Sequence, residues 1–411
     1  MNVPKGYKMT EVEVIPEDWE VKKLGELGIF LKGSGVKKNE SLSGDLPCIR
    51  YGEIYTKYNY YIKEIYSYIS HEVASTATKM EKNDILFAGS GETKEEIGKC
   101  VAFVHDLEAY AGGDIIILRP YKPYKIDSIF LGYYLNSAPI SKQKASKGQG
   151  DAVVHISTKA LSMIEVKIPS VDEQRSIARV LSDTDELINA LDKLIAKKRD
   201  IKKAVMQELL TGKTRLPRFS GKWEVNTIEQ CADCLDSLRV PLNETNRSKM
   251  QGHIPYCGAN GVLDYIDDFI IDDDIILLAE DGGYFDDYEN RPIAYRIRGK
   301  CWVNNHVHIL KAKRDFDQGF LFYSLVHKNI LAYLATGTRS KLNKKEMNKI
   351  EIFFPKDKAE QQAIAQVLSD MDKEITALEQ RRDKTKAIKQ GMMQALLTGR
   401  IRLPKGDTND A

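Results

Sequence analysis

The sequence lacks the features of a membrane-embedded or disulfide-bonded protein. Its 411 residues include only 6 Cys, which is too few for a disulfide framework. Apolar runs such as Ile115–Leu118 and Ile275–Ala279 are far shorter than the roughly 18 residues that a membrane span requires. The first twenty residues are acidic and contain no apolar stretch, so we expect no signal peptide. We therefore expect a globular, cytoplasmic protein with no membrane association.

An excess of one charge is also absent. The chain has 61 Lys and Arg against 59 Asp and Glu, a net charge of +2. No segment is a basic block, so composition alone does not indicate nucleic-acid binding. Any DNA-binding surface must therefore consist of local basic patches.

The strongest feature that is present is an internal repeat. Glu173–Pro217 aligns without a gap on Glu360–Pro404, 187 residues later, and more than half of the aligned positions are identical. A weaker repeat lies outside this region, where Trp19-Glu20-Val21 recurs as Trp223-Glu224-Val225. The order is therefore globular segment, repeat, globular segment, repeat.

Each repeat copy has the pattern of one long helix with a coiled-coil seam. Apolar residues recur at alternating spacings of four and three, and Gly212 and Gly399 are expected C-caps. Two unrelated amphipathic helices, each packing on its own domain, are the alternative. We favour pairing of the two helices with each other, because both copies share the seam and the caps. The expected seam residues are Ile177, Leu181, Ile188, Leu191, Ile195, Val205 and Leu209, with Ile364, Leu368, Met371, Ile375, Leu378, Met392 and Leu396.

The globular segments are predicted to be strand-rich. Runs of Tyr, Ile, Val and Phe punctuated by Gly, Asn and Asp are typical of such domains. The fold class is therefore α+β, with two strand-rich domains separated by two long helices in an antiparallel coiled coil with pseudo-two-fold symmetry. Helices of about 38 residues would form a rod of roughly 57 Å with a domain at each end. The expected boundaries are 1–168, 169–217, 218–355, 356–404 and a tail, 405–411.

With this repeat and domain order, the sequence resembles the specificity subunit of type I restriction–modification systems. The residues that carry the resemblance are Ile15-Pro16 with Trp19-Glu20, the two helix starts, and the two helix ends. The starts are Ile168-Pro169 with Glu173-Gln174 and Ile177, and Phe354-Pro355 with Glu360-Gln361 and Ile364; the ends are Leu210-Thr211-Gly212 and Leu397-Thr398-Gly399.

The resemblance covers the whole chain and implies a non-catalytic protein. Its two target-recognition domains would read the halves of a split double-stranded DNA site, and its helices would set the spacer and bind two modification subunits. Those subunits would bind S-adenosylmethionine and methylate adenine, and restriction (translocase) subunits would join them. The domain interiors vary within the family, so the resemblance assigns no DNA-contacting side chain.

Catalytic and metal motifs are incomplete, so we predict no catalytic residue, no cofactor bound by this chain and no metal site. Phe87–Gly91 matches a methyltransferase cofactor loop, but the chain lacks the adjacent Pro pair that an adenine methyltransferase uses. Thr211–Thr214 looks like the end of a phosphate-binding loop without its first Gly. Cys231 and Cys234 form half a zinc motif, for which structural thiols are the favoured interpretation. The carboxylates around Ile275–Ala279, Glu280 and Asp281 among them, are interpreted as strand ends and solvated turns.

Basic, Gly-containing stretches at comparable places in both domains are the best candidates for DNA contact. Ser141–Gly150 is interpreted as a loop before the first helix, with a counterpart at 339–345. The candidates are Lys32, Lys37, Lys38, Lys142, Lys144, Lys147, Gln149, Arg247, Lys249, Arg339, Lys341 and Lys344. Two other functions remain open from the residues alone: a self-contained methyltransferase and a coiled-coil adaptor without a DNA role.

Overall fold

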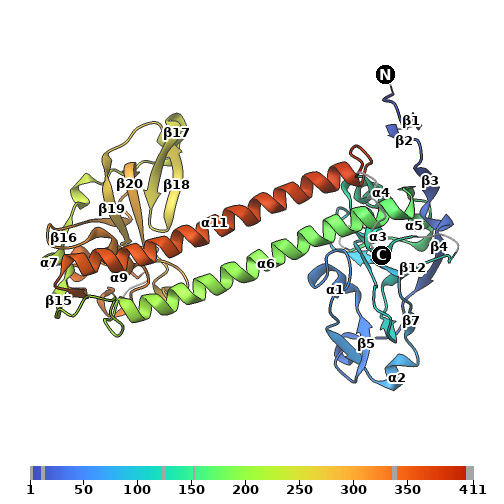
Figure 1. Ribbon diagram of the computed structural model, residues 1–411, viewed down its shortest axis with the longest axis horizontal. Helices are drawn as coiled ribbons and strands as arrows, with labels where there is room; N and C mark the ends of the chain where they lie inside the picture. Colours follow the sequence, from blue (N-terminus) through green and yellow to red (C-terminus); the bar gives the residue numbers. More distant parts are fainter. Residues whose placement is uncertain (1–2, 11–13, 123–125, 151–152, 336–339, 404–411) are drawn as a thin grey trace. The chain divides into compact units, whose positions relative to one another are not determined.

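The computed structural model describes residues 3–10, 14–122, 126–150, 153–335 and 340–403, and the predicted tail, 405–411, lies outside them. The chain divides into two compact units. Unit 1 contains residues 1–190 and 382–411, and unit 2 contains residues 191–381. The two long helices α6 and α11 run through both units, so each unit includes the start of one long helix and the end of the other (Figure 1).

Unit 1 is built on two four-stranded sheets. The first is antiparallel, with strand order β10 (Cys100–Ala102), β8 (Ile85–Ala88), β12 (Ile115–Pro120) and β4 (Gly28–Lys32). The second has the order β6 (Ser67–Ile69), β5 (Leu46–Ile49), β11 (Ala109–Ala111) and β7 (Thr78–Met80), with β11 parallel to β5. Three short pairs complete the strands: β1 (Tyr7–Met9) with β2 (Val14–Pro16), β3 (Glu20–Lys23) with β14 (Glu165–Ile168), and β9 (Ser90–Gly91) with β13 (Val154–His155). The helices are α1 (Tyr51–Thr56), α2 (His71–Ala74), α3 (Ser128–Tyr134), α4 (Ala138–Lys147) and α5 (Thr158–Ser162), with 3₁₀ turns at Leu24–Glu26 and Lys38–Glu40.

Unit 2 is built on one six-stranded sheet. Its order is β16 (Ala232–Cys234), β21 (Val307–Ala312), β19 (Ile271–Ala279), β20 (Ala294–Val303), β17 (Gln251–Gly258) and β18 (Gly261–Ile266), and only β17 and β20 pair in parallel among these strands. A separate pair joins β15 (Trp223–Thr227) to β22 (Glu351–Pro355). The helices are α7 (Ile228–Cys231), α8 (Glu244–Lys249), α9 (Gln318–Val326) and α10 (Lys344–Met347), with 3₁₀ turns at Asp236–Leu238, Phe285–Asp287 and Leu331–Tyr333. The strand-rich α+β prediction is confirmed in both units.

The two predicted long helices are present at equivalent positions. Helix α6 runs from Val171 to Leu209 and helix α11 from Lys358 to Leu396, and each has 39 residues. Gly212 and Gly399 follow with φ of 68° and 72°. This left-handed conformation favours glycine, which confirms both predicted helix ends. None of the helices in the described part of the chain combines the length and apolarity of a membrane span.

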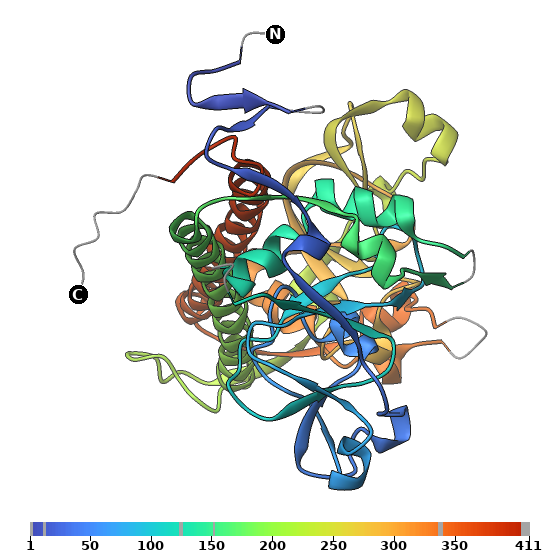
Figure 2. The ribbon, with the colours of Figure 1, turned by 90° about the vertical axis from the view of Figure 1, so that its right-hand side faces the viewer.

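Helices α6 and α11 pack against each other in an antiparallel direction, which Figure 2 shows close to end-on. In unit 2, Lys198 and Lys202 of α6 pair with Glu374 and Asp372 of α11, so numbering rises on one helix as it falls on the other. All predicted seam residues are buried or half-buried. The favoured interpretation, pairing of the two helices, and the alternative, packing of each helix on a domain, are both partly right. The helices pair with each other, and their ends also pack into domain cores. Those core members are Ile177, Leu181 and Leu396 in unit 1, and Leu209, Ile364 and Leu368 in unit 2.

Candidate nucleic-acid interface

The repeated Glu-Gln pair fastens each globular domain to the start of a long helix. In unit 1 the Gln174 amide donates to the Pro169 carbonyl oxygen (2.8 Å) and accepts from the Asp127 backbone N–H (2.9 Å). In unit 2 Gln361 makes the same bonds to Pro355 (2.9 Å) and Asp317 (2.7 Å). Asp127 and Asp317 in turn cap α3 and α9 by accepting the N–H of Phe130 and Phe320. The buried glutamines therefore set the position of one domain helix relative to one long helix in each unit.

The repeated Glu is held by the Arg that follows the end of the other long helix. In unit 2 the Arg215 guanidinium donates to both oxygens of Glu360, at 2.5 and 2.6 Å. In unit 1 Arg402 binds both oxygens of Glu173 and also pairs with Asp18. A Trp lies beside each pair: the Trp19 indole N–H donates to Glu173, and Arg215 lies over the Trp223 ring. Each bidentate pair ties the start of one long helix to the segment after the other.

A third set of contacts joins both long helices to the domain. In unit 1, Tyr133 of α3 donates to Asp185 of α6 at 2.6 Å, and Lys389 of α11 donates to the same carboxylate at 2.7 Å. In unit 2, Tyr323 of α9 and Lys202 of α6 bind Asp372 of α11. Burial and the neighbouring carboxylate raise the pKa of both Tyr hydroxyls, which therefore act as donors. We call these contacts the Tyr–Asp–Lys clamps.

Sequence reasoning missed the domain side of these clamps, although a signal exists. Asp127, Phe130, Leu131 and Tyr133 have the same order and spacing as Asp317, Phe320, Leu321 and Tyr323. This second repeat has an offset of 190 instead of 187. A gapless alignment at the offset of 187 does not pair these residues, so it does not reveal this second repeat.

Both units present an equivalent loop just before a short helix and the last domain strand. In unit 1, Gln149 and His155 exchange backbone hydrogen bonds of 2.9 and 2.8 Å and close the loop 149–155. In unit 2, the Ala335 N–H donates to the Lys341 carbonyl at 2.8 Å and closes the loop 335–341. The residue after each loop donates to the end of a central strand: Ile156 to Gly89, and Leu342 to Glu280. We call these segments the unit 1 loop and the unit 2 loop.

The predicted DNA-contacting residues of unit 1 lie on separate segments and differ in burial. Ser141–Lys147 is part of helix α4, not of a loop as expected. Within it, Lys142 is exposed, whereas Lys144 is 2% exposed and donates to the Gly98 carbonyl oxygen at 2.7 Å. Burial lowers the pKa of Lys144, and its amine is directed into the protein. Lys147 is half-buried, and Gln149, the first residue of the unit 1 loop, is exposed. Lys32, Lys37 and Lys38 are exposed on a different segment, around β4 and the following 3₁₀ turn.

In unit 2 several candidate charges are already paired. Arg247 lies 3.4 Å from Asp264 and donates to the Leu242 carbonyl, and Lys341 lies 3.0 Å from Glu280. Lys249 and Lys344 are exposed on α8 and α10. Arg339 lies outside the described residues. Of the described candidates, Lys341 is therefore the last residue of the unit 2 loop and is ion-paired, whereas Lys344 follows the loop and is exposed.

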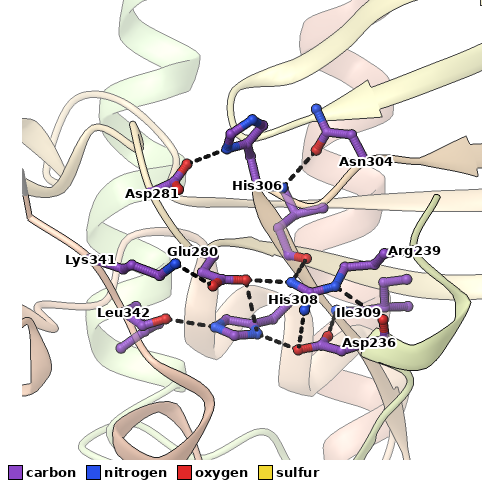
Figure 3. Close-up of polar contacts among 11 residues, drawn as sticks. Asp236, Arg239, Glu280, Asp281, Asn304, His306, His308, Ile309, Lys341 and Leu342 are labelled. Carbon is purple, nitrogen blue, oxygen red and sulfur yellow. Dashed lines mark hydrogen bonds and ion pairs between the residues drawn. The ribbon is translucent and has the colours of Figure 1, made fainter. Parts of the chain in front are cut away.

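A charged cluster contacts Lys341 and Leu342, where the unit 2 loop ends (Figure 3). It contains Asp236, Arg239, Glu280, His308 and Lys341, and the exposed pair of His306 with Asp281 borders it. Glu280 lies at a strand end as expected, directly after β19, but the expectation that it is solvated was wrong, because it is 9% exposed and ion-paired. Its burial costs solvation free energy, which the pairing with Arg239 and Lys341 offsets.

Cys234, Asp236 and His308 carry metal-capable atoms within 4.8 Å of one another. Their arrangement fits a hydrogen-bonded ion pair better than a metal site, because each ring nitrogen of His308 faces an oxygen of the protein. Cys231, the other half of the candidate zinc motif, is buried and contacts the Ile228 carbonyl instead. The two Cys of the motif therefore do not converge on one site.

Each strand-rich unit thus packs on the ends of the two long helices and has a loop closed by backbone hydrogen bonds. The family model for the type I restriction modification DNA specificity domain matches residues 16–202 and 221–390. The chain belongs to this family and is a DNA specificity subunit of a type I restriction–modification system, the non-catalytic component of its complex.

Individual relatives agree with this assignment, one of them over nearly the whole chain. The putative type I restriction enzyme MjaX specificity subunit of Methanocaldococcus jannaschii is 28% identical over 437 residues, which cover 97% of each chain. A putative specificity subunit of Haemophilus influenzae, S.HindORF215P, is 33% identical over 132 residues, about a third of either chain.

Solved structures show the same fold. The S subunit from M. genitalium superposes with a TM-score of 0.64 at 16% identity, over 95% of this chain and 97% of that one. The HsdS subunit from Thermoanaerobacter tengcongensis gives a TM-score of 0.52 at 17% identity, over 95% of this chain and 99% of that one.

Proposed function

We propose that the two units read the two halves of a bipartite, asymmetric double-stranded DNA target, each through its own loop and the flanking basic residues. The equivalent placement of the unit 1 and unit 2 loops is the observation that carries the proposal. Both are closed by a backbone bridge and end at the tip of a central strand. The residues within them differ, as expected if each unit reads a different sequence.

The chain acts within an assembly that supplies the catalysis. Two modification subunits bind the long helices, carry S-adenosylmethionine and methylate adenine in each half-site, and restriction (translocase) subunits join them. One solved structure of similar fold is described as showing the structural basis of complex assembly and conformational transition in a type I restriction–modification system. Exposed polar faces on α6 and α11, opposite the buried seam, provide surface for such subunits.

The basic residues around the loops supply phosphate contacts. In unit 1, Lys142 is exposed and Lys147 half-buried on α4, which precedes the loop, and the polar Gln149 is exposed within the loop; in unit 2, Lys344 is exposed after the loop. Lys144 is not in this set, because its amine is buried. Lys32, Lys37 and Lys38 of unit 1 and Lys249 of unit 2 are further exposed cations that we propose as phosphate contacts.

DNA binding by the reconstituted complex tests the assignment. Changing Lys142 and Lys147 together to Ala should weaken binding and reduce the slope of log affinity against log salt by up to about 0.9 per lost phosphate contact. Lys82→Ala is the control, because Lys82 is an exposed lysine of the same unit. It precedes the start of β8, whereas the residue after the unit 1 loop binds Gly89, beyond the end of that strand. An unchanged affinity and slope in the double variant would remove these lysines from the interface.

A further inference from the structure

His308 lies beneath the unit 2 loop with both ring nitrogens occupied. Its Nδ1 is 2.7 Å from an Asp236 carboxylate oxygen, and its Nε2 is 2.7 Å from the Leu342 carbonyl oxygen (Figure 3). The side chain is 1% exposed. Leu342 directly follows the unit 2 loop, so this ring connects the base of the loop to the turn after β16.

The two acceptors fix the protonation state of the ring. An ionised carboxylate and a peptide carbonyl have no hydrogen to donate, so each ring nitrogen must donate its own. A neutral imidazole has one N–H, and only the imidazolium satisfies both bonds. Burial lowers the pKa of His308, but its hydrogen bonds with Asp236, Cys234 and Leu342 outweigh this effect and raise the pKa to about 9.

The groups that face His308 support a positive charge there. Asp236 binds Nδ1 and also accepts the Ile309 N–H at 3.0 Å. A Glu280 oxygen lies 3.9 Å from Nδ1. Arg239 lies 3.4 Å from the same Asp236 oxygen and also pairs with Glu280, whose other oxygen lies 3.0 Å from Lys341. His308, Arg239 and Lys341 thus share the carboxylates of Asp236 and Glu280, and these five groups together carry one excess positive charge.

We propose that His308 is a positioning residue for target recognition by unit 2, which it serves by holding the base of the unit 2 loop in a fixed place. The inference rests on the proposed reading role of that loop. His308 makes no contact with DNA in this account. It acts through Leu342, and Glu280 acts with it through Lys341.

The two units hold the end of their loops differently. In unit 1 the end of the loop is a strand, β13, with a two-residue register to β9: Val154 with Gly91, and His155 with Ser90. In the described residues of the corresponding unit 2 segment, Lys341 forms isolated bridges to Ala335 and Asp281, and the Leu342 N–H donates to the Glu280 carbonyl oxygen. Two side chains of the cluster add contacts there: His308 binds the Leu342 carbonyl oxygen, and Glu280 pairs with Lys341.

The test is the methylated motif of a host that carries the complete complex with His308→Leu, which removes both donors. Unit 2's half-site is identified first, by replacing residues 336–339 with Gly-Ser-Gly-Ser. One base pair typically provides a roughly 5- to 150-fold preference for the correct base over a wrong one. His308→Leu should reduce this preference in the unit 2 half-site, so that sites with a wrong base are methylated nearly as often as correct ones. The half-site read by unit 1 should not change. His327→Leu is the control, because His327 is a half-buried unit 2 histidine that contacts the Tyr288 carbonyl away from the loop.

The outcomes separate the two proposals. If the loop replacement leaves both half-sites unchanged, the reading role itself is wrong. If the replacement alters one half-site but His308→Leu does not, only the positioning role is wrong. Should His308→Leu not fold, His308→Gln removes the charge and one donor and is expected to give a partial loss. Nitrogen NMR of the histidine rings provides a direct check, since His308 should show two protonated nitrogens at pH 7.5 and a neutral ring would overturn the proposal.

Discussion

The bidentate pair of Arg215 with Glu360 is expected to stabilise unit 2 far more than its equivalent stabilises unit 1. The Glu360 side chain is 1% exposed, and among the described residues its only charged partner is Arg215. Arg215→Ala would therefore leave a buried carboxylate without a compensating charge. Breaking a buried ion pair in this way typically costs about 3–5 kcal/mol.

The equivalent change in unit 1 provides a matched comparison. Glu173 is 10% exposed, keeps a hydrogen bond from the Trp19 indole, and shares Arg402 with the exposed Asp18. Water can reach this carboxylate more easily after Arg402→Ala, so the expected cost is smaller, about 1–3 kcal/mol. The same residue type at the same repeat position is thus predicted to differ in effect because its acid is buried to a different extent.

Native-state hydrogen exchange read by mass spectrometry measures this effect for each unit separately. At tenfold per 1.4 kcal/mol, amides of unit 2 that exchange through opening of the unit should exchange about two to three and a half orders of magnitude faster in Arg215→Ala. Amides of unit 1 should keep their protection. Glu360→Gln retains the shape and one acceptor, and we expect about 1.5–3 kcal/mol for the lost charge assistance. Equal, small effects of Arg215→Ala and Arg402→Ala would refute the reasoning from burial.

Three further predictions concern spacing, pH and catalysis. Seven residues inserted after Leu191, and seven more after Leu378, lengthen each long helix by about 10.5 Å and keep the heptad phase. The unread spacer of the methylated motif should therefore grow by up to roughly three base pairs, with both half-sites intact. An active complex with an unchanged spacer would contradict this prediction. Because the pKa of His308 is raised to about 9, its contribution to unit 2 stability is complete below pH about 6.5 and is lost as pH rises through 9. Unfolding titrations at several pH values should show the wild type losing stability relative to His308→Leu over this range, and a constant difference would exclude the ion pair. The purified chain with S-adenosylmethionine should transfer no methyl group to DNA until a modification subunit is added, and transfer by the chain alone would count against a purely recognising role.

The long helices could be predicted from the sequence because their information is local. A seam of apolar residues repeats along one helix face, and glycine marks both ends with its positive φ. Strands β8, β12, β19 and β21 were also predictable, since each contains a short buried apolar run. What the pattern could not show is that the ends of each seam pack into a domain core.

The candidate site was less predictable because its parts are distant in sequence. Helix α4 was taken for a loop because its composition is basic and polar, although Lys, Gln and Ala are good helix formers. Its two buried residues, Ile140 and Lys144, are four apart and share one helix face. Nothing local to Lys144 shows that its amine is directed to the Gly98 carbonyl.

The charged cluster of unit 2 shows the same limit. Asp236, Glu280 and His308 come from three segments that meet only when the six-stranded sheet forms. An acidic residue after an apolar strand is usually solvated, and this expectation placed Glu280 in a turn. Its partners, Arg239 and Lys341, are more than forty residues away on one side and sixty on the other.

Sequencing the methylated bases of a host genome, with and without the gene for this chain, tests the central claim most directly. The account predicts one adenine-methylated motif that requires the gene, with two different specified half-sites separated by an unspecified spacer. Exchanging unit 1's loop, residues 149–155, should change one half-site, and exchanging unit 2's loop, residues 335–341, should change the other. A motif that is continuous, or a methylation pattern that does not depend on either loop, would contradict the proposal that each unit reads one half of the target.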